Sequence, residues 1–232
     1  MRFVAITSWQ WISGHRAVIL ELLRQHAILT LIAVGVGLAI SLPLGVLAYR
    51  LGVTYGPITA LTGLLYTIPS LALFAFLTPF TGLSTTTAEI GLVSYTLLIL
   101  IRNIVAGLRA VPDDVKDAAR GMGYSRRQLL WRVELPLAAP AVVAGIRVAT
   151  VSTIGLLTVA ALIGKGGLGQ LILEGLRILY TTEILVGVAM SLLLALLADA
   201  AILLAERALT PWARGTRSRA WTPPRSSEVV GP

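Results

Sequence analysis

A polar, helix-forming stretch interrupts the long apolar runs of this chain: Asp117-Ala118-Ala119-Arg120-Gly121-Met122-Gly123, followed after nine residues by Val133-Glu134-Leu135-Pro136. A short helix is expected just before Gly123, because glycine enters the left-handed backbone region beyond a helix end without steric cost. Ser125-Arg126-Arg127-Gln128 has the spacing of a capping box and predicts a second helix, which Pro136 is expected to end. The sequence therefore predicts a helix, a sharp turn and a helix over residues 113–139.

The residues around this loop have the composition of a membrane protein. Hydrophobic residues make up 56% of the 232-residue chain and charged residues 13%, with a mean hydropathy of +0.84, whereas a soluble domain carries roughly 25% charged residues. Apolar runs are long enough for bilayer spans of about 20 residues. Five spans are expected, at residues 27–49, 57–77, 88–108, 140–163 and 184–204. The predicted fold is an all-α integral membrane protein with about five transmembrane helices.

The basic residues indicate how these spans are oriented. With residues 113–139 in the cytoplasm, fourteen of the 19 lysines and arginines fall on the cytoplasmic side, where membrane proteins accumulate such residues. The N-terminus is then external and the C-terminus cytoplasmic. This orientation explains the net charge of +8 better than nucleic-acid binding does.

The two ends of the chain are predicted to differ from the transmembrane domain, which is expected over residues 26–208. Residues 1–25 lack a clean signal-peptide core, and Trp9 and Trp11 suit a membrane surface. They predict an external interfacial helix, with a short sixth span as the alternative. Residues 209–232 are rich in Pro, Ser and Arg and predict a basic, disordered cytoplasmic tail that could bind anionic lipid.

The loop resembles the EAA loop of ABC importer permeases, whose pattern is Glu-Ala-Ala, three residues, Gly, nine residues and Ile-x-Leu-Pro. Asp117 stands for the Glu and Val133 for the Ile, and both changes keep the charge or the apolar character. The resemblance implies a type I importer permease fold in which small side chains let a cassette ATPase approach. The expected ATPase-coupling residues are Asp117, Ala118, Ala119, Gly121, Gly123, Leu135 and Pro136. An ordinary solvated connector is the alternative that the alanines and glycine alone would favour.

Other segments resemble the permease subunits of osmoprotectant importers, which handle glycine betaine, carnitine or choline. The resemblance runs from about residue 29 to 175. Permeases of methionine importers also have five spans, and a permease for methionine or another amino acid is the alternative. The segments are Thr67-Ile68-Pro69-Ser70-Leu71-Ala72-Leu73, Arg102-Asn103, Gly107-Leu108, Gly145-Ile146-Arg147-Val148-Ala149-Thr150-Val151 and Ile163-Gly164-Lys165-Gly166-Gly167-Leu168-Gly169.

The resemblance also implies which partners the chain needs. From the resemblance it is expected to be a transport subunit of a bacterial or archaeal cytoplasmic membrane, with no catalytic residues and no bound cofactor. ATP and Mg are used by separate cassette ATPases, and an external substrate-binding protein delivers the solute. A second permease copy or paralogue completes the pathway; membrane lipid is a partner and nucleic acid is not.

Charges and a proline inside the spans suggest where the pathway lies. Arg102, Arg147 and Asp199 are expected at the inner ends of three different spans, and charges at membrane depth are usually paired or line a cavity. They predict an inner-gate ion cluster, with snorkelling to the interface as the alternative. Pro69 and Ser70 are expected to break or kink the second span, either lining the path or serving as a packing kink.

Three other classes of function find little support in the sequence. The chain has no cysteine, and His15 and His26 fall outside the predicted spans, which argues against an intramembrane enzyme. Residues 84–87 are too generic for a channel filter, and a purely structural subunit would not need a docking loop. Residues 164–169 match G-x-G-x-x-G, but they follow a predicted membrane helix and not a strand, so they predict an external turn and not a nucleotide site. The few aromatic residues of the spans are interpreted as packing, not as a cage for a quaternary ammonium; they are Tyr66, Phe74, Phe76 and Tyr95.

Overall fold

A computed structural model describes residues 8–210 as a bundle of helices with no strand in that range. The expectations for residues 1–7 and for the tail from residue 211 lie outside the described residues. The elements are α1 (Trp9–Gly14), α2 (Arg16–Arg50), α3 (Gly52–Thr67), α4 (Ser70–Thr81), α5 (Thr85–Arg109), α6 (Asp113–Gly121), α7 (Arg126–Leu129), the π-helix η1 (Leu130–Glu134), α8 (Leu135–Val159), the 3-10 helix η2 (Ala160–Ile163), α9 (Gly169–Arg177) and α10 (Thr181–Leu209).

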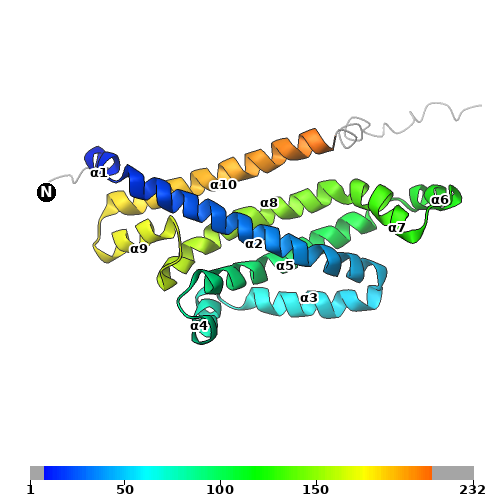
Figure 1. The fold of residues 1–232 in the computed structure, drawn as a ribbon, viewed down its shortest axis with the longest axis horizontal. Helices are drawn as coiled ribbons and strands as arrows, with labels where there is room; N and C mark the ends of the chain where they lie inside the picture. Colours follow the sequence, from blue (N-terminus) through cyan, green and yellow to red (C-terminus); the bar gives the residue numbers. More distant parts are fainter. Residues whose placement is uncertain (1–7, 211–232) are drawn as a thin grey trace, which may run out of the picture.

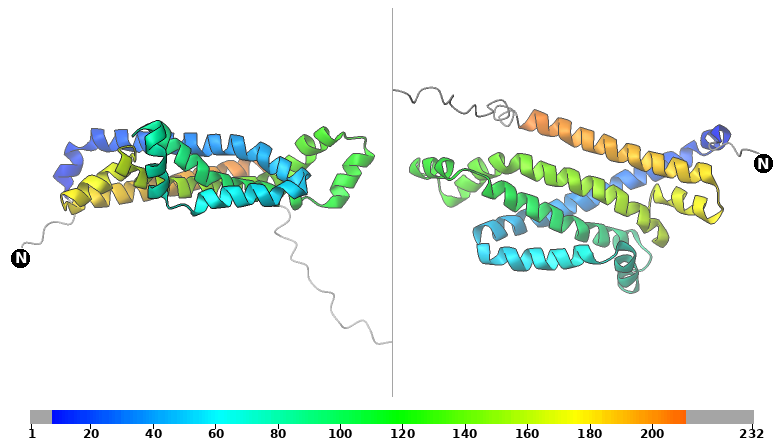
Figure 2. Two further views of the ribbon diagram at one scale, coloured as in Figure 1. Left: turned by 90° about the horizontal axis from the view of Figure 1, so that it is seen from below. Right: turned by 180° about the vertical axis from the view of Figure 1, so that it is seen from behind.

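The helices that can span a membrane lie lengthwise in one elongated bundle (Figure 1). Among the described residues, four helical segments are long and apolar enough to cross a bilayer: Arg16–Arg50, Thr85–Arg109, Arg126–Ile163 and Thr181–Ala208. The pair α3 and α4 meets the same test as one span but is bent by 95°, and α4 stands across the end of α3 in Figure 2. The predicted all-α membrane fold with about five spans is confirmed.

Small residues bring α2 against α5 at the centre of the bundle. A Cβ added to Gly45 of α2 would lie 2.7 Å from Cγ2 of Ile104, and one added to Gly37 would overlap Oγ1 of Thr96. Gly45 follows Gly37 by about two helical turns, and Ile104 follows Thr96 by the same amount. Because both contacts advance together along the chain, α2 and α5 run in the same direction. Glycine at these positions lets the two backbones approach closely, as in other membrane helix pairs.

α5 packs against α8 in the same way, through small residues. A Cβ on Gly107 of α5 would lie 2.9 Å from the carbonyl oxygen of Ala138, and one on Gly145 of α8 would lie 2.6 Å from Cβ of Asn103. α5 therefore packs against both α2 and α8, which helps to explain why most of its apolar side chains are buried.

The first membrane helix begins at Arg16 and not near residue 27, so the expected interfacial helix is limited to α1. The charges of Glu21 and Arg24 do not end the helix, because they pair with each other at 2.8 Å on its exposed face. Ile19 on the opposite face is buried in a cluster with Leu171 of α9 and with Leu168 just before that helix. Residues 16–25 thus belong to the same helix as the first predicted span.

Pro136 does not end the second helix of the polar loop, contrary to the prediction. α7, η1 and α8 form one continuous helical segment from Arg126 to Ile163. A proline inside a regular α-helix clashes with the carbonyl group four residues earlier. Here the wider π-turn of η1 precedes it, and Pro136 falls in the first turn of α8, where its missing N–H is tolerated.

Candidate functional site

The sharp turn of the polar loop is built by a glycine at the end of α6. Gly123 has φ +84°, a left-handed conformation that glycine adopts without a steric penalty. The Gly123 N–H donates to the Arg120 carbonyl at 2.9 Å and the Tyr124 N–H to the Ala119 carbonyl at 3.2 Å. These are the two bonds of a Schellman motif, which satisfies carbonyl groups left free at a helix end.

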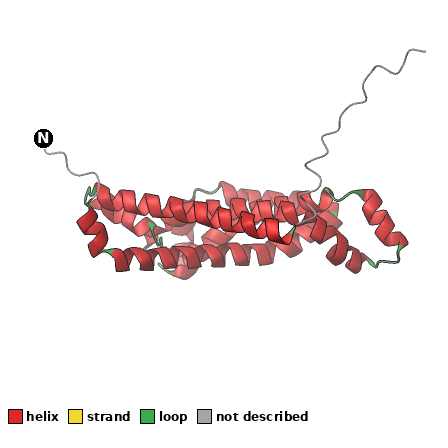
Figure 3. Cartoon of the chain, turned by 90° about the horizontal axis from the view of Figure 1, so that it is seen from above, coloured by secondary structure: helices red, strands yellow, loops and turns green. Residues whose placement is uncertain are grey.

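A capping box starts the second helix directly after this turn. The Ser125 hydroxyl accepts a hydrogen bond from the Gln128 N–H at 3.3 Å, and the Ser125 N–H donates to Oε1 of Gln128 at 2.8 Å. The predicted helix, turn and helix are confirmed, and they project past the ends of the long helices (Figure 3). We call residues 113–129 the hairpin.

The predicted coupling residues of the hairpin do not all face the same way. Ala118 is exposed, whereas Ala119 is 2% exposed and packs toward the bundle. Gly121 and Gly123 have open space where a side chain would stand. Asp117 is exposed and accepts a hydrogen bond from Arg120 at 2.6 Å. The outward surface of the hairpin is therefore low in relief, with Met122, 69% exposed, as its largest apolar side chain.

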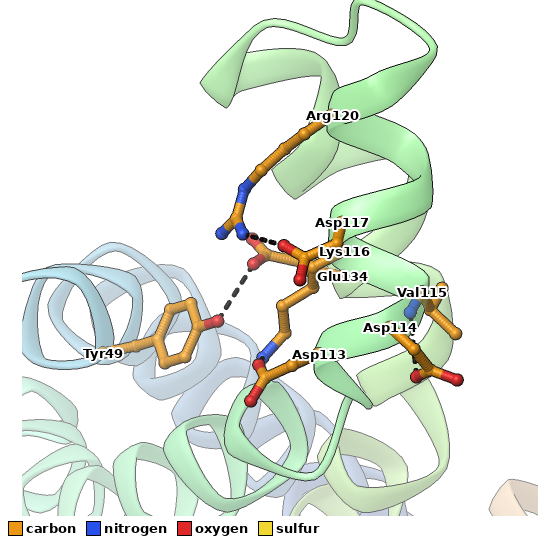
Figure 4. Close-up of polar contacts among 8 residues, drawn as sticks. All are labelled: Tyr49, Asp113, Asp114, Val115, Lys116, Asp117, Arg120 and Glu134. Atoms are coloured by element: carbon orange, nitrogen blue, oxygen red, sulfur yellow. Dashed lines mark hydrogen bonds and ion pairs between the residues drawn. The ribbon is translucent and has the colours of Figure 1, made fainter.

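The hairpin and the π-helix η1 that follows it are attached to α2 by polar groups that come from distant parts of the sequence (Figure 4). The Tyr49 hydroxyl at the end of α2 donates to Oε1 of Glu134 at 2.9 Å, and Glu134 is 4% exposed. The ammonium group of Lys116 lies 5.9 Å from the centre of the Tyr49 ring and 3.0 Å from Oδ1 of Asp113. Burial opposes the charge of Lys116, but its bonds to Asp113 and Tyr49 outweigh burial and raise its pKa. Lys116 therefore stays charged where it holds α6 to α2.

Two further contacts join the hairpin and the residues directly after it to the helices of the bundle. The Arg50 guanidinium donates to the backbone carbonyl of Arg126 at 2.7 Å. Leu130 is buried in an apolar cluster with Leu100 and Ile104 of α5, and Leu135 packs against the same cluster. The sequence analysis named Leu135 and Pro136 as ATPase-coupling residues, and it did not identify Tyr49, Arg50 or Lys116 as parts of this attachment. A buried lysine and a paired glutamate could not be recognised without knowing which residues surround them.

Pro69 and Ser70 lie at the break between α3 and α4, as predicted. The residue before a proline is pushed out of the helical region, and Ile68 has φ −65° and ψ 127°. Its free carbonyl accepts a hydrogen bond from the Tyr95 hydroxyl at 2.5 Å, and the Tyr95 ring stands edge-on to Tyr66 at 5.9 Å. A neighbouring helix thus satisfies the backbone group that the break exposes.

Only part of the predicted ion cluster forms. Both guanidinium nitrogens that Arg147 turns toward Asp199 lie 2.8 Å from its carboxylate oxygens, a bidentate pair that joins α8 to α10. The two side chains are 30% and 32% exposed. Arg102 is exposed on α5 and forms no ion pair with either residue among the described side chains. Arg102, Arg147 and Asp199 were predicted at the same depth in the membrane, but only Arg147 and Asp199 lie close together. Arg102 is exposed elsewhere on the bundle.

At the far end of the bundle from the hairpin, His26 lies inside α2 and not outside the spans, which corrects the sequence prediction. It is fully buried: its Nε2 lies 3.1 Å from the Ile154 carbonyl, and its Nδ1 accepts the Leu168 N–H at 3.3 Å. Gly167, with φ +51°, fits directly against the histidine. The predicted turn at residues 164–169 is therefore fastened to two long helices.

Sequence reasoning also missed Glu89, one turn into α5. Both of its carboxylate oxygens are buried without a hydrogen-bond partner among the described residues, as is the hydroxyl of Thr30 on α2. A single acid in an otherwise uncharged apolar run was a signal that could have drawn attention to this position.

A family model described as a binding-protein-dependent transport system inner membrane component matches residues 35–215. The chain belongs to this family. It is therefore a multi-pass membrane permease subunit, and the hairpin lies within the matched residues.

Two curated relatives are similar to most of the permease. The choline transport system permease protein OpuBB of Bacillus subtilis is 39% identical over 188 residues, covering 81% of this chain and 86% of the relative. The glycine betaine/carnitine/choline transport system permease protein OpuCB of the same organism is 36% identical with the same coverage. The fold is similar to that in an inward-facing structure of the MetNI methionine ABC transporter, with a TM-score of 0.76, 23% identity, and coverage of 85% of this chain and 98% of that chain.

Proposed function

We propose that this permease carries a small quaternary-amine osmoprotectant of the glycine betaine, choline or carnitine type as part of an ABC importer. The names of the similar curated permeases support this substrate class. The MetNI similarity, at 23% identity, supports the fold alone. We assign selection of the solute mainly to a separate external binding protein.

The observation that carries the mechanism is the hairpin, whose exposed outer surface is low in relief while its inner surface is tied to two long helices. A cassette ATPase docks on the side that carries Ala118, Gly121 and Gly123. Small side chains there leave room for a groove on the partner to close around α6.

The connections of the hairpin suggest how ATPase movement reaches the membrane. α7 continues through η1 into α8, so a displacement of the hairpin turns or tilts α8 as one rigid body. The Tyr49–Glu134 bond and the Lys116 contact carry the same displacement to the end of α2. A movement of the hairpin is then transmitted to α8 and α2, the two long helices that pack against α5.

In this proposal the hairpin is cytoplasmic, the N-terminus external and the C-terminus cytoplasmic. A second permease copy or a paralogue faces this chain across the pathway. The partner ATPase binds and hydrolyses ATP with Mg, while this chain binds no cofactor and supplies no catalytic residue. The Arg147–Asp199 pair lies on the inner half of the pathway and opens or closes with α8.

Uptake by cells that express the chain with its neighbouring transport genes tests the substrate class. Radiolabelled glycine betaine, choline and carnitine are each offered beside radiolabelled methionine, at low and high osmotic strength. Accumulation of at least one quaternary amine, competed by the other two, is the expected result. Accumulation of methionine alone would reject the proposed substrate and leave the family membership intact.

Co-purification tests the docking surface separately from the substrate. Gly123→Arg places a long side chain at the hairpin turn, in a backbone conformation that favours glycine. Gly14→Arg makes the same chemical change at an open position at the other end of the bundle. The ATPase should be lost from the first variant and retained by the second, with both variants eluting as folded permeases. Retention of the ATPase by Gly123→Arg would reject the hairpin as the docking surface.

A further inference from the structure

A deep groove separates the end of α2 from the hairpin and the start of α8. Its volume is about 1090 Å³, above the upper end of the range for pockets that hold drug-sized molecules, about 300–1,000 Å³. Its walls change character along the helices. Leu42 and Val46 of α2 and Leu135 of α8 form the apolar part, and Arg50 and Arg126 stand at the end where α2 terminates.

The two arginines present positive charge that no carboxylate of residues 8–210 neutralises. Arg50 bonds to the backbone carbonyl of Arg126, and neither residue forms an ion pair among the described residues. Each guanidinium has five N–H donors in a planar fork that matches phosphate oxygens. The other arginine of the groove, Arg120, is already paired with Asp117.

The carboxylate of Glu134 lies on the groove wall, but it repels a bound anion less than an exposed carboxylate would. Glu134 is 4% exposed and accepts the hydrogen bond of Tyr49. The ammonium group of Lys116 stands over the same Tyr49 ring. The accessible charge at the mouth of the groove therefore comes from Arg50 and Arg126.

The position of the groove restricts what can fill it. Leu42 precedes Arg50 by eight residues, and a helix rises about 1.5 Å per residue, so the apolar wall reaches on the order of 12 Å below the arginines. With Arg50 placed at the membrane surface, that depth lies among the acyl chains, which a protein outside the membrane does not reach. Trp131, 57% exposed on the groove wall, is the kind of side chain that collects at the boundary between lipid tails and headgroups.

We propose that this groove is a binding site for an anionic phospholipid. The phosphate group lies between the guanidinium groups of Arg50 and Arg126, and an acyl chain lies along Leu42, Val46 and Leu135. Basic grooves between membrane helices have this selectivity, because an anionic headgroup and a tail satisfy both halves at once. The bound lipid bridges the end of α2 and the start of α7, beside the Tyr49–Glu134 contact. This site does not depend on which solute is transported.

Photo-crosslinking of the whole transporter in nanodiscs tests this site. Phosphatidylglycerol with a diazirine in its acyl chain is compared with phosphatidylcholine carrying the same chain, and labelled peptides are located by mass spectrometry. Labelling of residues 42–51 and 126–135 by the anionic lipid should exceed labelling by the zwitterionic lipid about 25-fold, since each of the two arginines near the surface contributes about a fivefold preference.

Two matched double variants separate the site from general attraction of the hairpin to anionic lipid. Arg50→Gln with Arg126→Gln removes the two groove charges and should abolish the preference. Arg127→Gln with Arg132→Gln removes the same charge from the same segment outside the groove wall and should keep it. Val46→Trp fills the apolar part and should reduce labelling by both lipids. All variants must elute as wild type on size exclusion.

Three outcomes would overturn the proposal. Equal labelling by the two lipids would mean that the groove holds ordinary boundary lipid. Loss of the preference in excess inorganic phosphate would mean a site for free phosphate. Protection of these peptides by a protein partner, with no lipid label, would mean that a protein fills the groove.

Discussion

The contact between α2 and α5, which we call the seam, is made through glycine residues. The two short helices of the hairpin instead meet the bundle through polar side chains. The seam places Gly37 and Gly45 directly against side chains of α5, with no room for an added carbon. The hairpin depends on single contacts such as Tyr49–Glu134 and leaves Gly121 and Gly123 in open space. The difference shows that the seam tolerates no added volume, whereas the hairpin keeps a free surface and a small number of separable attachments.

The largest expected effect comes from adding volume to the seam. Gly37→Leu must push α2 away from Thr96, and overpacking of this kind costs typically about 1–3 kcal/mol, occasionally more. We expect little or no folded permease by fluorescence-detected size exclusion. Gly35→Leu, two residues away with nothing near its added side chain, should elute as wild type. Similar profiles for both variants would remove the distinction between seam and hairpin.

A smaller effect is expected from cutting one attachment of the hairpin. Tyr49→Phe leaves the buried Glu134 carboxylate without its hydrogen bond, and a bond to a charged group is worth roughly 1.5–3 kcal/mol. The bundle should stay folded while trypsin cleaves the arginines of the hairpin faster. Tyr55→Phe is the control, since the hydroxyl of Tyr55 donates no hydrogen bond within residues 8–210 and its ring stays under Arg109. Unchanged cleavage of Tyr49→Phe would show that the other attachments are sufficient.

The Arg147–Asp199 pair lies between these extremes of seam and surface, because it joins two long helices but is about one-third exposed. Arg147→Asp and Asp199→Arg should each lower thermal stability and uptake, by less than Gly37→Leu does. The exchanged double variant should recover much of both, measured in the same assays. Failure of the exchange to rescue either property would argue that the two charges act separately.

The smallest effect on stability is expected on the outer surface of the hairpin. Asp117→Asn removes an exposed pair three residues apart, and such pairs contribute roughly 0.2–0.5 kcal/mol. The melting temperature should hardly change, while ATPase retention falls if this surface is the docking site. Glu174→Gln removes a comparable exposed pair with Arg177 at the other end and should change neither. An equal loss of ATPase in both variants would mean that the effect is not local.

Features that depend on neighbours in the chain were predictable. The left-handed turn at Gly123, the capping box at Ser125 and the break at Pro69 all follow from the conformations that their own residues allow. The prediction at Pro136 failed because it treated a proline as a helix end without the π-turn that precedes it. The start of the first span was placed too late, because Glu21 and Arg24 looked like interruptions and are a pair on one exposed helix face.

The sequence by itself determined the class of fold, the number of spans and the shape of the hairpin, because hydropathy and local backbone preferences act over a few residues. Only the tertiary structure decided that Arg147 pairs with Asp199 while Arg102 does not, that His26 is buried, and that Tyr49 and Lys116 hold the hairpin. It also decided that Ala119 faces inward and Ala118 outward. These outcomes depend on the register in which the helices pack, and that register is set by where glycine lets distant segments come together.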